Sequence, residues 1–144
     1  MIETDHIARW LKQPFEVDEE QARDLTTDFE IAICEALLRD DPDHIPALAA
    51  VGHIYTRSGE HDKALAIDRR LAVLLPTDPI AHYNLACSLS NLEEVDEALV
   101  ELQRSIDLGY VDHQFMMKDP DLENARSHPR FRSLLDRARR KSRG

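Results

Sequence analysis

Hydrophobic residues recur at helical spacing along most of the chain, in runs separated by glycine, proline and acidic residues. One run predicts a helix over about residues 46–58, which Gly59 ends because glycine adopts the left-handed C-cap conformation at little cost. The next predicts a helix over about residues 62–75, which stops before Pro76 because proline cannot continue a helix interior. The pattern therefore predicts a pair of antiparallel helices with apolar faces at Leu48, Val51 and Tyr55 and at Ala64, Ile67, Leu71 and Leu74.

This pattern returns when the chain is laid on itself with a shift of 34 residues. A helix pair cannot bury its apolar faces alone, so stacked pairs that share one continuous core are expected. The unit occurs twice in full and once as a trailing half, "DFEIAICEALLRDDPD". Identical residues coincide without a gap at Ala47/Ala81, Glu60/Glu94, Asp62/Asp96, Ala64/Ala98, Leu65/Leu99, Arg70/Arg104 and Leu74/Leu108.

The segments "LAAVGHIYTRSGEHDKALAIDRRLAVLLPTDP" and "HYNLACSLSNLEEVDEALVELQRSIDL", with the trailing half, resemble the tetratricopeptide repeat family over about residues 29–110. The resemblance implies an all-α fold, a right-handed superhelical array of antiparallel helix pairs (an α–α solenoid) with atypical helical caps at both ends. The chain departs from the family pattern at three positions. Glu93 replaces the turn glycine, Tyr110 replaces the closing proline, and Asp68 replaces a large residue.

We expect a single domain over residues 1–144. Its parts are an N-terminal cap helix over 1–17, an atypical first repeat helix over 18–42, repeats over 45–78 and 79–110, and C-terminal capping helices over 111–144. After Leu108 the repeat phase is lost, and the sequence predicts a short helix, an Asp-Pro turn and a closing helix. The apolar residues of the ends are Ile7, Trp10 and Leu11, then Ala22, Leu25, Phe29, Ile33 and Leu37, and finally Phe131, Leu134 and Leu135.

Composition narrows the classes of partner. The net charge of −10 disfavours a nucleic-acid or anionic-membrane binder. The charge is uneven, because residues 109–144 carry 9 bases against 5 acids; this basic tail could bind acidic surfaces or dock on its own body. No apolar run could span a membrane, the N-terminus lacks the layout of a signal peptide, and Cys34 and Cys87 form no CxxC pair. These features predict a cytoplasmic protein with free, buried thiols.

The sequence offers no candidate for catalysis, no cofactor motif and no metal site. The seven histidines form neither an HExxH motif nor a close cluster with cysteine. No GxGxxG, GxxxxGK[ST] or GxSxG is present. A non-enzymatic protein is therefore expected.

A binding surface remains. In the family that this chain resembles, the first helix of each pair lines a concave groove, and its non-core positions face the ligand. The resemblance implies partner-binding positions at Ala49, His53 and Arg57 in one repeat and Tyr83, Asn84, Cys87 and Asn91 in the next. The alternatives are that these residues are merely solvated, or that the closing helix occupies the groove.

The leading hypothesis is an adaptor or scaffold that binds a peptide or helix of another protein in this groove. The second is a structural unit that self-assembles through unpaired helix faces. In it, the acidic N-terminal part of one copy would meet the basic C-terminal part of the next. The third is a small acidic chaperone for a secreted client. Asp68 is expected at a partly open seam between repeats, with Ile67 in the core, because a buried unpaired carboxylate would cost several kcal/mol.

Overall fold

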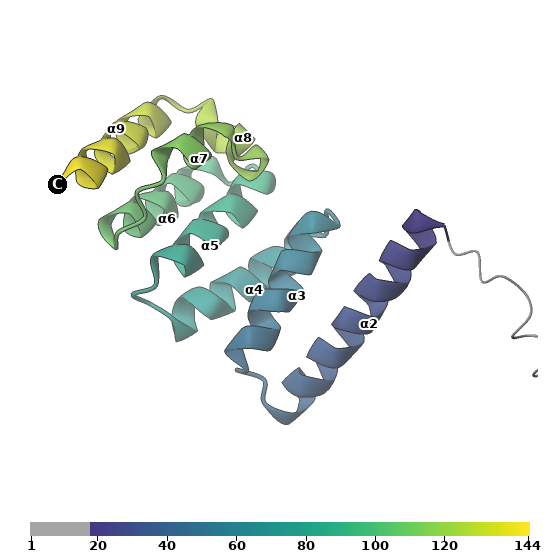
Figure 1. The fold of residues 1–144 in the computed structure, drawn as a ribbon. Helices are drawn as coiled ribbons and strands as arrows, with labels where there is room; N and C mark the ends of the chain where they lie inside the picture. Colours follow the sequence, from purple (N-terminus) through teal and green to yellow (C-terminus); the bar gives the residue numbers. More distant parts are fainter. Residues whose placement is uncertain (1–17) are drawn as a thin grey trace, which may run out of the picture.

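The computed structural model describes residues 18–144, and this part of the chain is helical with no strand. The predicted cap helix over 1–17, including Trp10, lies outside the described residues. The helices between residues 19 and 107 lie side by side in chain order, and the C-terminal elements pack against the last two of them (Figure 1). Their bounds are α2 Glu19–Asp40, α3 Ile45–Arg57, α4 His61–Leu74, α5 Pro79–Asn91, α6 Val95–Asp107, α7 His113–Lys118, the 3₁₀ turn η1 Pro120–Leu122, α8 Glu123–Arg126 and α9 Pro129–Arg143.

The 34-residue period governs where helices begin. The first helices of successive pairs, α3, α5 and α7, begin at Ile45, Pro79 and His113, and the second helices, α4, α6 and α9, begin at His61, Val95 and Pro129. The expectation that the phase is lost after Leu108 is therefore wrong. The sequence match fades there because α7 ends at Lys118 and the Asp-Pro step breaks the element that stands in the place of a third first helix.

Local residue chemistry explains the helix ends. The Asp18 carboxylate accepts a hydrogen bond from the Gln21 N–H at 2.7 Å and so caps α2. Gly59 follows α3 with a φ of +77°. Glu93, one period later, adopts a φ of +62° although it is not glycine. The turn geometry is thus kept where the glycine of the pattern is missing, at some cost in backbone strain.

The largest apolar cluster joins α5 and α6 to the C-terminal elements. It includes Leu99, Leu102, Met116, Leu122 and Phe131, each at most 3% exposed. A smaller cluster of Cys34, Ala47 and Val51 joins α2 to α3, with Ile67 packed against it as predicted. The C-terminal elements are therefore part of the main core and do more than cover its end.

Helix α2 presents two neighbouring sets of apolar residues, of which only one is buried. Cys34 is buried against α3, and Leu38 packs beside it. The residues that define its apolar periodicity in the sequence form the other set, the outward face of α2, and are exposed: Leu25 60%, Phe29 68%, Ile33 46% and Leu37 41%. Within residues 18–144 nothing covers this outward face.

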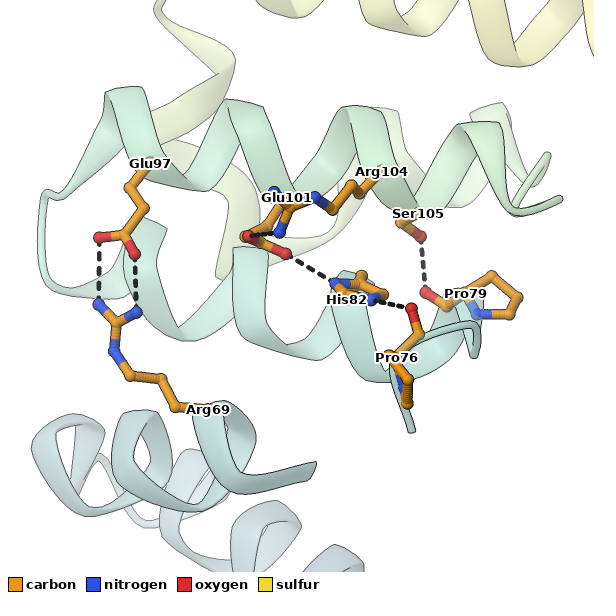
Figure 2. A network of polar contacts seen from close by, with 8 residues as sticks. All are labelled: Arg69, Pro76, Pro79, His82, Glu97, Glu101, Arg104 and Ser105. Atoms are coloured by element: carbon orange, nitrogen blue, oxygen red, sulfur yellow. Dashed lines mark hydrogen bonds and ion pairs between the residues drawn. The ribbon is translucent and has the colours of Figure 1, made fainter. Parts of the chain in front are cut away.

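Polar contacts fix the order of α4, α5 and α6 (Figure 2). His82 is 5% exposed, and its ring nitrogens lie 2.7 Å from Glu101 Oε2 and 2.8 Å from the Pro76 carbonyl oxygen. His82 thus joins α5 to an acceptor on α6 and to one in the linker before α5. Arg104 also donates to Glu101, at 2.8 Å, so the carboxylate of Glu101 is bound from both sides. The linker between the two repeats is thereby attached to α6.

None of the helices within residues 18–144 is both long and apolar enough to cross a membrane.

Candidate functional site

A pocket of about 190 Å³ lies where α3, α4, α5 and the C-terminal elements meet. Its rim includes Ala49 and His53 from α3, Asn84 from α5 and Phe115 from α7, all of which are exposed. The buried part of its wall includes Asp68 from α4 and Asp119 from the turn before η1. The other lining residues are Gly52, Thr56, Leu71, Tyr83, Cys87 and Asp121.

Five of the seven predicted binding positions line this pocket. They are Ala49, His53, Tyr83, Asn84 and Cys87. Arg57 does not line it and instead borders an open hollow between α2 and α3. Asn91 donates a hydrogen bond at 3.1 Å to Asp121, which lines the pocket.

Two of the predicted positions are not open surface. Tyr83 is 5% exposed and Cys87 is 6% exposed, because the C-terminal elements pack over this part of α5. Tyr83 stacks on Tyr110 with ring centroids 4.1 Å apart and donates a hydrogen bond at 2.6 Å to Asp119. Tyr83 is therefore covered, and the C-terminal elements occupy part of the predicted groove.

Burial raises the pKa of the two groups in the pocket wall that could act as nucleophiles, the Cys87 thiol and the Tyr83 hydroxyl. Loss of solvent raises the pKa of the Cys87 thiol well above its ordinary value, and the nearby Asp119 carboxylate raises it further. The pKa of Tyr83 is raised by the same causes, with the Cys87 thiol contributing after burial. A thiol that keeps its proton is a poor nucleophile. Cys87 therefore gives the pocket no reactive centre.

Asp68 is the least expected residue of the pocket. It is 5% exposed, so the prediction of a partly open seam is wrong. Ser88 donates a hydrogen bond to its Oδ2 at 2.5 Å, and no described residue donates to Oδ1. Burial raises the pKa of Asp68 to about 6, and the hydrogen bond from Ser88 opposes that rise. Among the described residues, the carboxylate of Asp68 is therefore paired only with the neutral hydroxyl of Ser88.

Gly52 makes the approach of α3 to Asp68 possible. A Cβ at this position would lie 3.0 Å from Ile67 Cγ2 and 3.4 Å from Asp68 Oδ1. The 3.0 Å contact would push the Ile67 side chain away by a few tenths of an ångström, so the small residue at this position favours close approach of the two helices. It also leaves space beside the free carboxylate oxygen.

Specific hydrogen bonds hold the part of the pocket wall that the C-terminal elements form. Asp119 Oδ2 accepts from Tyr83, and Oδ1 accepts the Asp121 N–H at 3.0 Å. The Ser90 hydroxyl accepts the Ala125 N–H at 3.1 Å in a fully buried position. Sequence reasoning missed Asp119, Asp121 and Phe115 as pocket residues. Continuing the 34-residue period beyond Leu108 would have placed Asp121 at the groove position of Cys87 and His53, but Phe115 and Asp119 at the buried positions of Ala81 and Leu85.

Sequence comparison places the chain in no known family. No family model matches it. A stretch of 84 residues, 56% of this chain, is 32% identical to a chloroplastic protein of Arabidopsis thaliana. The match covers 25% of that protein, so the chain spans about a quarter of the length of this relative. Within residues 18–144 no group of three or more metal-binding side chains lies together.

Proposed function

We propose that this protein is a non-enzymatic interaction module of the tetratricopeptide repeat type, and that it binds an extended segment of a partner protein across α3 and α5. The observation that carries the proposal is the pocket itself. It lies on the face shared by two first helices, and five positions implied by the family resemblance line it. A rigid, preformed surface of this kind favours binding, because little conformational freedom is lost when the partner docks.

Several further features support an interaction role for a helical array. Helix starts recur every 34 residues through three pairs, as expected for stacked repeats of one superhelical array. The pocket contains polar groups that can orient a ligand, but its thiol is kept protonated by burial. Cys34 and Cys87 are free thiols, which suits a reducing compartment such as the cytoplasm.

Bulky substitutions at the rim test the proposal without touching the core. Ala49 lines the pocket and is exposed, whereas its neighbour Ala50 is equally exposed but does not line it. We expect Ala49→Trp to lose partner proteins that the wild type captures from its native lysate, as identified by mass spectrometry. Ala50→Trp is the matched control and should keep them. Equal capture by both variants would place binding on another face.

The outward face of α2 favours a second candidate function, self-association with another copy of the chain. This face exposes Leu25, Phe29, Ile33 and Leu37, and α2 carries seven acidic residues against two basic ones. Helix α9 carries seven basic residues against one acidic residue, so the two ends of the molecule are complementary in charge. Head-to-tail contact would cover the apolar face of α2.

Light scattering on the full chain tests self-association. We expect oligomers at low salt that weaken at high salt, since screening reduces attraction between exposed charges. Phe29→Glu should abolish them, while Val73→Glu, at an equally exposed apolar residue of α4, should not. A monomer at both salt concentrations would exclude this candidate.

A further inference from the structure

The pocket lining is acidic, and the nearest arginine to it, Arg126, binds the Asp119 backbone carbonyl oxygen rather than a carboxylate. Three carboxyl groups line it, those of Asp68, Asp119 and Asp121, and none of its lining residues is lysine or arginine. Asp119 is compensated by hydrogen bonds to both oxygens, from Tyr83 and from the Asp121 N–H. Asp68 is not, because only one of its oxygens accepts a hydrogen bond. A polar ligand could supply the missing donor.

The fold does not require a carboxylate at residue 68. Leu102 occupies the equivalent position one period later and is fully buried. An apolar residue therefore suits this place in the helix pair. A buried carboxylate costs free energy unless it is paired, and Asp68 is paired only by the Ser88 hydroxyl. Its presence together with an adjoining cavity points to a ligand that completes the pair.

The size and walls of the pocket define that ligand. A space of about 190 Å³ accepts one long side chain but no folded element. The exposed ring of Phe115 lies at the rim, where it can contact an aliphatic stem or a cation. His53 and Asn84 complete the rim with hydrogen-bonding groups.

We infer that the pocket binds the ammonium or guanidinium group of a lysine or arginine side chain, presented by the partner segment. The inference rests on the proposed function, because that segment is the same one that crosses α3 and α5. The cation donates to the free Oδ1 of Asp68, and the carboxylates of Asp119 and Asp121 add to the attraction. The stem of the side chain lies against Phe115.

Short capped peptides that differ at one residue test this assignment. The set is Gly-Gly-X-Gly-Gly with X as lysine, arginine, glutamine or glutamate, titrated into the full chain and followed by the amide signals of His53 and Asn84. We expect the lysine and arginine peptides to bind about tenfold more tightly than the glutamine peptide, as a charge-assisted hydrogen bond implies. The glutamate peptide should not bind.

Two neutralising substitutions separate the pocket from general charge effects. Asp68→Asn should weaken binding of the lysine peptide about tenfold. Asp62→Asn makes the same change at an exposed position of α4 and should leave the affinity within about twofold, because exposed charges are screened. Equal binding of the lysine and glutamine peptides, or no effect of Asp68→Asn, would overturn the inference.

The outcomes also distinguish the inference from the proposed function. Peptides that bind at His53 and Asn84 without charge preference would refute the cation site but keep the groove as a binding surface. Absence of binding by every peptide would refute the cation site as well. The capture experiment with Ala49→Trp would then decide the fate of the groove independently.

Discussion

Replacing Asp68 by asparagine should stabilise the folded protein at neutral pH. The substitution keeps the shape of the side chain and an oxygen that can accept the hydrogen bond from Ser88. It removes the charge that burial disfavours. A variant of a wall residue that gains stability is informative, because loss of ligand affinity in the same variant could not be attributed to unfolding.

The pKa of Asp68 gives the size of the expected gain in stability. Burial raises the pKa of Asp68 from 3.8 to about 6. One pKa unit corresponds to about 1.4 kcal/mol, so ionised Asp68 costs the folded state about 3 kcal/mol at neutral pH. Asparagine accepts a weaker hydrogen bond from Ser88 than a carboxylate does, which offsets part of the gain. We expect a net increase of about 1–3 kcal/mol in the free energy of unfolding.

The raised pKa of Asp68 also predicts how the stability gained in Asp68→Asn changes with pH. The folded state holds a proton on Asp68 up to about pH 6, whereas the unfolded chain releases it near 3.8. Between these values the folded state binds more protons, so Asp68 lowers the stability of the wild type as pH rises. The advantage of Asp68→Asn should therefore be full at about pH 7.5 and mostly lost at about pH 4.

Urea denaturation followed by circular dichroism, at both pH values, measures this difference. The wild type, Asp68→Asn and the exposed control Asp62→Asn are compared at each pH, so that changes in the titration of other carboxylates cancel. A variant that is less stable than the wild type at about pH 7.5 would refute the reasoning, as would a gain of equal size at both pH values.

Three further predictions follow from particular contacts. Glu93→Gly should raise the free energy of unfolding by about 1 kcal/mol in urea denaturation, because Glu93 adopts a φ of +62° that glycine accepts readily; an unchanged or lower value would refute the strain. Ser90→Ala should lower it by about 1–3 kcal/mol, since the buried Ala125 N–H loses its acceptor; no loss would mean that the C-terminal elements dock without this bond. Binding of the lysine peptide should weaken by up to about tenfold from pH 7.5 to pH 5 as Asp68 is protonated; His53, Cys87, Asp119 and Asp121 face the same pocket, so only the part of this dependence that Asp68→Asn abolishes belongs to Asp68.

The helices could be predicted from sequence because their signals are local. The predicted spans 46–58 and 62–75 differ by one residue at each end from α3 and α4, since caps, turn glycines and prolines act over a few neighbouring residues. The orientation of α2 could not be predicted in this way. Its sequence offers two neighbouring sets of apolar residues, and periodicity alone does not say which one packs against α3.

The pocket was predicted in part for a related reason. The position of a residue on a first helix follows from the repeat, so Ala49, His53 and Asn84 were found at the rim. The burial of Tyr83 was not, because it depends on residues about 27 to 36 positions later in the chain, from Tyr110 to Asp119. A contact between segments so far apart is fixed by tertiary packing, about which helical spacing says nothing.

The C-terminal elements build the pocket as well as cover the core. Asp119 shows this most directly, since it accepts hydrogen bonds from Tyr83 and from the Asp121 N–H and lines the pocket with the same side chain. Ser90, on α5, accepts a hydrogen bond from the Ala125 N–H and so attaches α8 to α5. The wall therefore depends on the same bonds that attach α7, η1 and α8 to α5. A substitution that loosens these bonds should lower both stability and affinity, whereas Asp68→Asn should raise one and lower the other.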